Sequence, residues 1–291
     1  MPRLAYVDGR IVPLTEATVS IEGRGLQFAD SVYEVCAVMN GRLLDWPQHR
    51  ARLGRNLGEL SIVPPMQDAA LTAVAHRLLA ANRAREALLY IQVSRGSARR
   101  EHVFATGMQP TLMMTVRRFD FAQRVAQQAA GIAVVSMPDE RWGRCDIKTT
   151  GLLANVLAKQ AARDAGAFEA LLVGSDGLVA EGGSTNVWAV IGGRLITPPL
   201  GHRLLPGVMR ETLMRLARNA GIAVDEQPLS LAAAQSADEL LLTSTTVPAL
   251  PIVRLDDKPI GRGHPGPVAI RLAALLWAEI DEQTGYRPGL H

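Results

Sequence analysis

Four short dipeptides that contain glycine constrain the fold of this chain more than any other feature, because each of them separates two apolar runs. Dipeptides of this composition adopt the backbone angles of tight turns, so they predict a series of β-hairpins. The four turns are Asp8-Gly9, Asn40-Gly41, Asp176-Gly177 and Gly192-Gly193. The strands that we expect span residues 88–94, 112–116, 132–137, 170–173, 187–191 and 240–244.

Helical periodicity appears in separate segments between these strands. Leu53, Leu57 and Leu60, for example, recur at the spacing that places side chains on one helix face. Elsewhere, long runs of Ala and Leu without a breaker favour the same structure. The expected helices lie after Trp46-Pro47, over 66–83, over 152–161, over 209–220 and after Pro265-Gly-Pro267.

Strands and helices are mixed without a regular βαβ alternation, and no internal repeat is visible, so the sequence predicts an α+β fold with two lobes. The charged stretch 117–124 separates the last early strand from a segment rich in Ala and Gln. We therefore expect a small N-terminal domain over 1–120, a linker over 121–125 and a large C-terminal domain over 126–291.

Composition excludes several classes of protein. Hydrophobic residues make up 48% and charged residues 20% of 291 residues, as in ordinary globular enzymes. The net charge of +3 is small and no basic stripe carries aromatic residues, so nucleic acid is not expected as a partner. No apolar run is long enough for a membrane span, and the histidines lack the spacing of metal ligands. Two cysteines, Cys36 and Cys145, offer no disulfide framework and favour the cytoplasm.

Lysine is rare in this chain, since only three lysines stand against 28 arginines. One of them, Lys148, lies in the segment Arg141-Trp-Gly-Arg-Cys-Asp-Ile-Lys148, which is rich in reactive side chains. Arginine binds anions, but only the lysine amine loses its proton readily and forms a Schiff base with an aldehyde. By itself Lys148 is either such a nucleophile or a solvated cation. Lys159 and Lys258 are expected to be solvated.

A glutamate in a glycine-rich loop changes this balance. Glu181 is followed by Gly-Gly-Ser-Thr-Asn186, which alone is compatible with an ordinary hairpin turn. Together, however, a lysine for an aldehyde and a carboxylate for a ring nitrogen are what pyridoxal 5'-phosphate requires. The carboxylate keeps the pyridine nitrogen protonated, so that the ring accepts electrons from the substrate.

Four segments, in the same order along the chain, resemble the class IV aminotransferases of fold type IV. Because they run from Arg24 to Thr246, the similarity covers most of the chain. The segments are Arg24-Gly-Leu-Gln-Phe-Ala-Asp-Ser-Val-Tyr33-Glu-Val, Asp146-Ile-Lys148-Thr-Thr-Gly-Leu-Leu, Glu181-Gly-Gly-Ser-Thr-Asn-Val-Trp188 and Leu242-Thr-Ser-Thr-Thr246.

The resemblance implies a two-domain fold with a small α/β lobe and a larger, barrel-like lobe, and it implies pyridoxal 5'-phosphate as cofactor. It assigns the Schiff base and the proton transfers to Lys148, and the ring nitrogen to Glu181. For the phosphate group it implies Arg52, with Arg50 the weaker match in register. It also implies the backbone N–H groups of Val208 and Met209 and the hydroxyl of Thr245, with Thr246 as the alternative.

Substrate specificity is expected from Arg100 and His102. They resemble an Arg-x-His pair of the D-amino acid aminotransferases, which binds the substrate carboxylate across a dimer interface, and Tyr33 resembles a tyrosine that completes this trap. Arg95 and Arg99, in contrast, are expected to be solvated. The resemblance therefore implies a homodimer that transfers the amino group of a D-amino acid, D-alanine foremost, to a 2-oxo acid such as 2-oxoglutarate in a ping-pong cycle.

Two other activities remain open within the family. A branched-chain L-amino acid aminotransferase shares the lysine and the glutamate, and an aminodeoxychorismate lyase uses the same cofactor without a 2-oxo acid acceptor. A non-catalytic carrier of the cofactor would not need the residues of the trap. The chain also departs from the family pattern at Ala29-Asp30-Ser31, where Gly-Asp-Gly is more common, and at Met209, where a small polar residue is common. We expect these departures to weaken retention of the cofactor.

Overall fold

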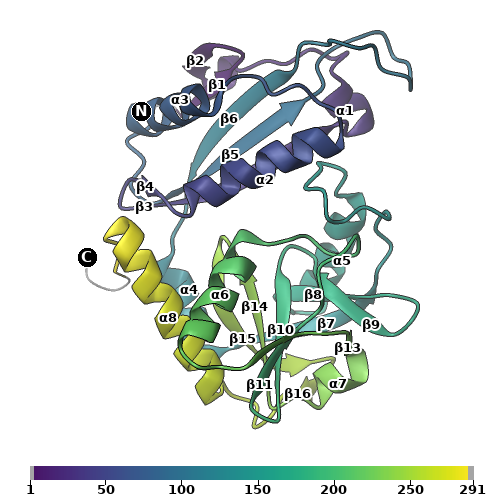
Figure 1. Ribbon diagram of the computed structural model, residues 1–291, viewed down its shortest axis with the longest axis vertical. Helices are drawn as coiled ribbons and strands as arrows, with labels where there is room; N and C mark the ends of the chain where they lie inside the picture. The colour runs from purple at the N-terminus through teal and green to yellow at the C-terminus, as the bar shows by residue number, and fades with distance from the viewer. Residues whose placement is uncertain (1–2, 288–291) are drawn as a thin grey trace. The chain divides into compact units, whose positions relative to one another are not determined.

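The computed structural model describes residues 3–287, and it combines helices with two sheets, as the α+β prediction requires (Figure 1). Contacts divide the chain into two compact units, with the first break between Asp120 and Phe121. The first unit also contains Ile147–Gly151 and Gln283–Tyr286, which return to it from later in the chain. The sequence predicts two continuous domains with a linker over 121–125. It does not predict that two later segments belong to the first unit.

An antiparallel six-stranded sheet forms the centre of the first unit, in the order β2-β1-β6-β5-β3-β4. The hairpins expected at Asp8-Gly9 and Asn40-Gly41 are confirmed by the registers Val7↔Arg10 and Met39↔Arg42. These strands are β1 (Leu4–Val7), β2 (Arg10–Pro13), β3 (Ser31–Met39), β4 (Arg42–Leu43), β5 (Ala87–Ser94) and β6 (Thr111–Arg118).

Helices α2 (Trp46–Glu59) and α3 (Asp68–Ala81) bury their apolar faces in one cluster with this sheet (Figure 1). The predicted stripe is confirmed, because Leu53 and Leu57 are each only 3% exposed. Two short elements precede β3, the 3-10 helix η1 (Leu14–Glu16) and the helix α1 (Arg24–Phe28).

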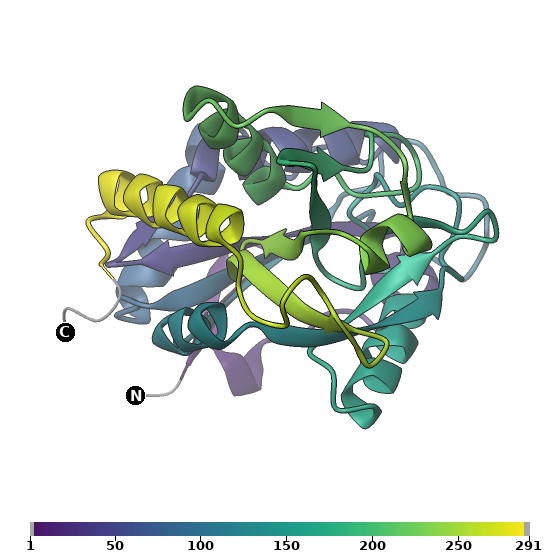
Figure 2. The same cartoon turned by 90° about the horizontal axis from the view of Figure 1, so that it is seen from below.

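The second unit contains a curled sheet, in the order β12-β11-β10-β14-β15-β7-β8-β9-β13, with β16 paired to β15 (Figure 2). Hairpins join β8 to β9 and β10 to β11, as expected at Asp176-Gly177 and Gly192-Gly193. The strands are β7 (Ile132–Pro138), β8 (Glu169–Val173), β9 (Leu178–Gly182), β10 (Asn186–Ile191), β11 (Arg194–Thr197), β12 (Val224–Glu226), β13 (Leu229–Ser230), β14 (Glu239–Ser244), β15 (Val247–Leu255) and β16 (Lys258–Pro259).

Helices surround this second sheet. They are α4 (Ala122–Ala130), α5 (Leu153–Asp164), α6 (Val208–Asn219), α7 (Leu231–Gln235) and α8 (Pro267–Thr284). The expected helices at 152–161 and 209–220 therefore correspond to α5 and α6. On α5, however, small residues rather than large ones pack on the sheet, since Ala162 is fully buried whereas Leu153 is 73% exposed. Within residues 3–287, the structure has no helix that meets the length and apolarity needed for a membrane span.

Candidate active site

Lys148 lies in a segment that runs beside the start of β3 in the first unit. Thr149 forms an antiparallel bridge with Val32, and the Lys148 carbonyl accepts a 3.0 Å hydrogen bond from the Tyr33 N–H. The side chain extends over the ring of Tyr33, with Nζ 4.2 Å from the ring centroid. Main-chain pairing holds this segment beside β3, and the half-buried Lys148 side chain lies over the Tyr33 ring.

The ring of Tyr33 also stacks on the ring of Tyr90, which lies on the neighbouring strand β5. The two ring centroids are 5.6 Å apart, with an angle of 28° between the planes. The Tyr90 hydroxyl donates to Oε1 of Gln92 at 2.7 Å, and burial raises the pKa of Tyr90 to about 12. The Tyr90 hydroxyl is therefore neutral at physiological pH, and its ring packs against that of Tyr33.

Arg52 is buried between α2 and β3, where it pairs with Glu34. Its Nε and Nη2 donate to the two carboxylate oxygens at 2.7 and 2.8 Å, and His49 Nδ1 lies 2.8 Å from Oε2. Burial alone would raise the pKa of Glu34, but the charge of Arg52 and the hydrogen bonds from Arg52 and His49 lower it to about 2. Glu34 is thus ionised and holds the guanidinium plane of Arg52 in one orientation. Arg50, in contrast, pairs with the exposed Asp68.

Arg100 and His102 lie on the exposed loop between β5 and β6. The Arg100 guanidinium is 5.2 Å and the His102 ring 5.4 Å from the centroid of Phe28. Both side chains are exposed in the single chain. The structure therefore places them beside Phe28, while Tyr33 lies with Lys148 and Tyr90.

A buried ion cluster anchors this loop. Asp30 accepts hydrogen bonds from Arg24 at 2.7 Å and from Arg95 at 2.8 and 2.9 Å, and Arg24 also donates to the carbonyls of Glu101 and His102. Burial opposes ionisation of Asp30, but these hydrogen bonds outweigh it and lower its pKa. The expectation that Arg95 is solvated is wrong, because its side chain is only 7% exposed. Arg99 is exposed, as expected.

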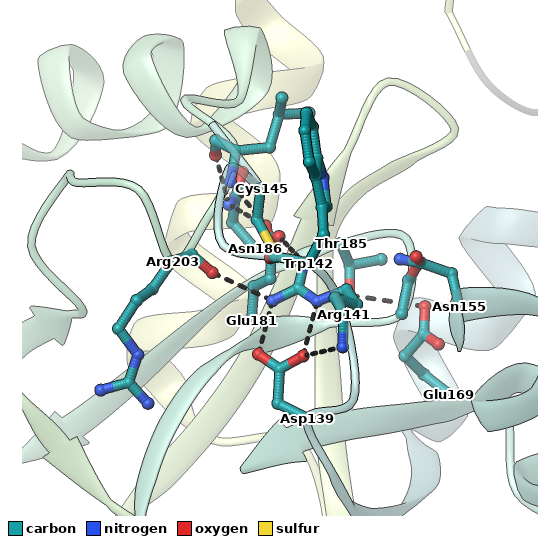
Figure 3. Close-up of polar contacts among 12 residues, drawn as sticks. Asp139, Arg141, Trp142, Cys145, Asn155, Glu169, Glu181, Thr185, Asn186 and Arg203 are labelled. Carbon is teal, nitrogen blue, oxygen red and sulfur yellow. Dashed lines mark hydrogen bonds and ion pairs between the residues drawn. The ribbon is translucent and has the colours of Figure 1, made fainter. Parts of the chain in front are cut away.

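Glu181 is a buried carboxylate of the second unit, near the end of β9 (Figure 3). Its Oε2 accepts hydrogen bonds of 3.1 Å from Nδ2 of Asn186 and from the N–H of Leu205. Its Oε1 accepts from Nη1 of Arg141. These donors stabilise the ionised carboxylate and fix its orientation.

Arg141 is itself held by Asp139, in a bidentate pair with two distances of 2.9 Å, and by the carbonyl of Arg203 at 3.0 Å (Figure 3). Burial alone would lower the pKa of Arg141, but the hydrogen bond to Asp139 and the charge of Glu181 raise it above its ordinary value. The pKa of Asp139 is lowered, because the hydrogen bonds and charge of Arg141 outweigh the effect of burial. Asp139 and Arg141 are therefore both charged, and Nη1 of Arg141 donates to the carboxylate of Glu181.

The start of α6 lies next to the glutamate loop through Asn186. A Cβ atom on Gly207 would approach Oδ1 of Asn186 to 2.0 Å, so this close contact requires glycine. Gly207 is the N-cap of α6, and the N–H groups of Val208 and Met209 are in its first turn. A helix N-terminus favours an anion, because its first N–H groups have no partner within the helix and the helix dipole is positive there.

Thr245 follows β14 at the same end of the second sheet. Thr243 pairs with Asn186, which ends the loop that follows Glu181. Thr245 lies two residues after Thr243. The alternative, Thr246, has its hydroxyl 3.2 Å from Oγ of Ser244, and its N–H donates to the same oxygen. The second unit thus gathers Glu181, the start of α6 and Thr245 around Asn186.

The remaining lysines and the cysteines differ in their environments. Lys258 is exposed as expected, and the Lys159 side chain remains 37% exposed while its amine pairs with the buried Glu169 at 3.0 Å. Burial raises the pKa of Cys145 to about 11, which keeps its thiol protonated and excludes a thiolate nucleophile. Among the residues that the structure describes, no group of three or more His, Cys, Asp or Glu side chains could hold a metal ion.

Glu34, Asp139 and Arg141 were not assigned a role from the sequence. Arg141 stands only seven residues before Lys148, and Asp139 precedes it by two, but an isolated Asp-x-Arg pair does not indicate its target. Only the fold brings β9 beside this segment. Glu34 follows Tyr33 directly in β3. Because successive side chains of a strand face opposite sides of the sheet, the sequence could have indicated that Glu34 faces away from Tyr33.

Comparison with known proteins identifies the family of the chain. The family model for class IV amino-transferases matches residues 31–255, which include Lys148, Glu181 and the start of α6. A D-alanine aminotransferase of Bacillus licheniformis is 36% identical over 277 residues, which cover 95% of this chain and 97% of the relative. Another, from Listeria monocytogenes serotype 4b, is 32% identical and covers 96% of each chain.

Solved structures share the fold at lower identity. The branched-chain amino acid aminotransferase of Escherichia coli superimposes with a TM-score of 0.88 at 22% identity, over 100% of this chain and 98% of the other. A hypothetical aminotransferase from Mycobacterium tuberculosis, in its PLP-bound form, gives 0.82 at 22% identity, over 96% and 99%. The fold is thus that of the aminotransferases of fold type IV. The chain belongs to the class IV amino-transferase family.

Proposed function

We propose that this protein is a pyridoxal 5'-phosphate-dependent aminotransferase that moves the amino group of a D-amino acid, D-alanine foremost, to a 2-oxo acid such as 2-oxoglutarate. The observation that carries the proposal is the pairing of Lys148 with Tyr33 in the first unit, together with the ionised Glu181 of the second. The relatives named D-alanine aminotransferase, at 31–36% identity over most of the chain, support the substrate class.

The donor set fits the cofactor. Lys148 supplies the amine for its aldehyde, Glu181 the anion for its ring nitrogen, and Arg52 a cation for its phosphate. The contact of Gly207 with Asn186 leaves no room for a side chain at the helix start, where Val208 and Met209 offer N–H groups to the same phosphate. Thr245 adds a hydroxyl. When bound, the cofactor supplies an aldehyde that joins the substrate amine and a ring that accepts electrons.

The protein's own side chains then carry the proton transfers. The Lys148 amine would take the proton from the substrate Cα as general base and would then donate it as general acid. Main-chain pairing with Tyr33 holds the Lys148 backbone beside β3. Glu181 holds the proton on the ring nitrogen. The second half of the ping-pong cycle reverses these steps with the 2-oxo acid.

We assign the substrate carboxylate to a trap formed by Tyr33, Arg100 and His102. A planar guanidinium binds a carboxylate through two hydrogen bonds, which fixes one side of the substrate. In the single chain, Arg100 and His102 are exposed beside Phe28, which supports a role toward a second copy of the chain in a homodimer. An apolar stripe on α5, formed by Leu153, Val156 and Leu157, is also exposed and suits burial in a dimer. Two free cysteines support a cytoplasmic location.

The test is a half-reaction. The cofactor-loaded enzyme is mixed with D-alanine, L-alanine or L-leucine, and the decay of the visible absorbance is followed in a stopped-flow instrument. D-alanine should react far faster than either L-amino acid. Arg100→Ala should lower kcat/KM for D-alanine about 10- to 100-fold, since a charged hydrogen bond is lost. Arg99→Ala, an exposed arginine of the same loop, is the matched control and should behave like the wild type.

Equal or faster reaction with L-leucine would overturn the proposal in favour of a branched-chain aminotransferase, whose fold the structure shares. Release of pyruvate from aminodeoxychorismate without an acceptor would instead identify a lyase.

A further inference from the structure

Glu181 is the end of a chain of three alternating charges in the second unit (Figure 3). Asp139 pairs with Arg141, and Arg141 pairs with Glu181, while the side chains are 12%, 7% and 7% exposed. Charges removed from water to this degree are costly unless they are paired. The arrangement therefore needs a physical reason beyond surface solubility.

Arg141 is immobilised more strongly than one carboxylate requires. Asp139 binds its Nε and Nη2 in the bidentate geometry, and the Arg203 carbonyl accepts from Nη2, so the remaining Nη1 is directed at Glu181. The Arg203 guanidinium does not compete, because it pairs with Asp176 at 2.6 and 3.1 Å. Arg141 thus contacts Glu181 from one fixed side.

The charges decide what this contact does. An arginine alone beside Glu181 would cancel its negative charge and disfavour a cation on the other side of the carboxylate. Asp139 cancels the charge of Arg141 instead, so the three groups together carry one negative charge. Glu181 is then oriented by a strong donor and still presents a net negative charge to a protonated ring nitrogen.

We propose that Arg141, held by Asp139, is a positioning residue that keeps Glu181 ionised and correctly oriented toward the protonated ring nitrogen of the cofactor. This inference rests on the proposed function, because it assumes that Glu181 faces the ring. Arg141 itself does not touch the substrate. We expect Arg141 to affect the rate of removal of the substrate Cα proton, which needs the ring as electron acceptor, and to have little effect on substrate binding.

The experiment reads the ring nitrogen directly. The holoenzyme is loaded with cofactor labelled with ¹⁵N in the ring, and the nitrogen resonance at fixed neutral pH reports whether the ring is protonated. Arg141→Met removes the donor that orients Glu181 and leaves Asp139 and Glu181 as neighbouring like charges, so Glu181 should take up a proton and turn away from the ring. The resonance should then move toward the deprotonated position, and Arg141→Lys should restore part of it. The maximum rate of the D-alanine half-reaction should fall about 10- to 100-fold, the range typical when an outer hydrogen-bond partner is removed. KM should change much less.

Asp139→Asn provides a second variant if Arg141→Met does not fold. It leaves the charge of Arg141 uncompensated, so the resonance should move in the same direction. Arg144→Met is the matched control, since Arg144 forms a similar bidentate pair with Asp146 at 2.9 and 3.0 Å in the same segment. Its resonance should equal that of the wild type.

Glu181→Gln distinguishes a failure of the role inferred for Arg141 from a failure of the role proposed for Glu181. If Glu181→Gln moves the resonance while Arg141→Met, or Asp139→Asn in its place, leaves it at the wild-type position, the inference about Arg141 is overturned and the role of Glu181 stands. If Glu181→Gln itself leaves the resonance unmoved, the assignment of Glu181 to the ring nitrogen fails, and the inference about Arg141 fails with it.

Discussion

At the scale of single residues, Glu34 shows how a buried acid depends on its neighbours. Its pKa is about 2 in the folded protein, below the ordinary value of 4.5, although burial alone would raise it. A lowered pKa means that the ionised acid stabilises the fold above about pH 4.5 and that this stabilisation is lost as the pH falls toward 2. The pairing with Arg52 therefore contributes to stability at neutral pH and not in strong acid.

Glu34→Gln tests this directly. At pH 7 the variant should lose about 3 kcal/mol of unfolding free energy, because the buried Arg52 and His49 lose the charged carboxylate that they bind. The difference from the wild type should shrink as the pH falls from 5 to 3, which urea unfolding at several pH values measures. Asp68→Asn removes the exposed partner of Arg50 and should have little effect at any pH. A constant difference between Glu34→Gln and the wild type would contradict the prediction.

Ala29 is one of the departures from the family pattern, and its backbone conformation shows what this departure costs. Its backbone has φ 53° and ψ 26°, the left-handed conformation in which glycine avoids the clash of a Cβ atom. The sequence shows alanine where glycine is common, but the backbone angle that makes this costly is visible only in the structure.

Ala29→Gly should therefore raise the unfolding free energy by up to about 1 kcal/mol, despite the greater freedom of glycine in the unfolded chain. Thermal unfolding measures the change. Ala17→Gly is the control, because Ala17 has φ −74° and should gain nothing. A loss of stability in both variants would show that strain at Ala29 is not significant.

At the scale of secondary structure, the sequence predicted local pairing well and distant pairing poorly. The glycine-containing turns placed the hairpins at Asn40-Gly41 and Gly192-Gly193 correctly, since the turn conformation depends on adjacent residues. The parallel pairing of β7 with β15 joins strands more than 100 residues apart, and no local pattern encodes it. The apolar face on α5 was also found from the sequence, but periodicity alone could not show that its large residues are exposed.

Some residues of the candidate site could be predicted from the sequence, and others could be found only from the fold. Lys148 and Glu181 could be selected from the sequence because their residue types match the chemistry of one cofactor. Asn186 and Gly207 act through a contact between β10 and the start of α6, and such a contact follows only from the fold. The same is true of Arg141, whose target lies 40 residues away along the chain.

Gly207→Ala tests this element-level contact. The new Cβ would displace Asn186, which holds Glu181, so the variant should lose about 2 kcal/mol of unfolding free energy and bind pyridoxal 5'-phosphate more weakly. Urea unfolding and a spectroscopic cofactor titration measure the two effects. Gly201→Ala is the control, because a Cβ there would meet no atom within 4 Å. If Gly207→Ala binds the cofactor as the wild type does, the start of α6 does not depend on Asn186.

At the scale of the whole molecule, the proposed activity depends on a second copy of the chain. Lys148 lies against Tyr33, whereas Arg100 and His102 are exposed on a loop that Arg24 anchors through the carbonyls of Glu101 and His102. An anchored loop with exposed functional side chains suits insertion into a partner's site. Light scattering should therefore give the mass of a dimer.

Subunit mixing gives the sharper result. Lys148→Ala should abolish transamination because it removes the amine, and Arg100→Ala should strongly reduce it because it removes the carboxylate donor. If Arg100 serves the partner's site, a hybrid dimer of the two variants contains one site with both residues intact and one with neither. Dissociation and reassociation of an equal mixture should form hybrids in half of the dimers, each with one active site, so activity should recover to about a quarter of the wild-type level, with D-alanine as donor. Each variant treated alone is the control. Because a trap within one chain would leave every hybrid site defective, no recovery in dimers shown by mass to have exchanged would place Arg100 in the same site as its own Lys148 or outside the site altogether.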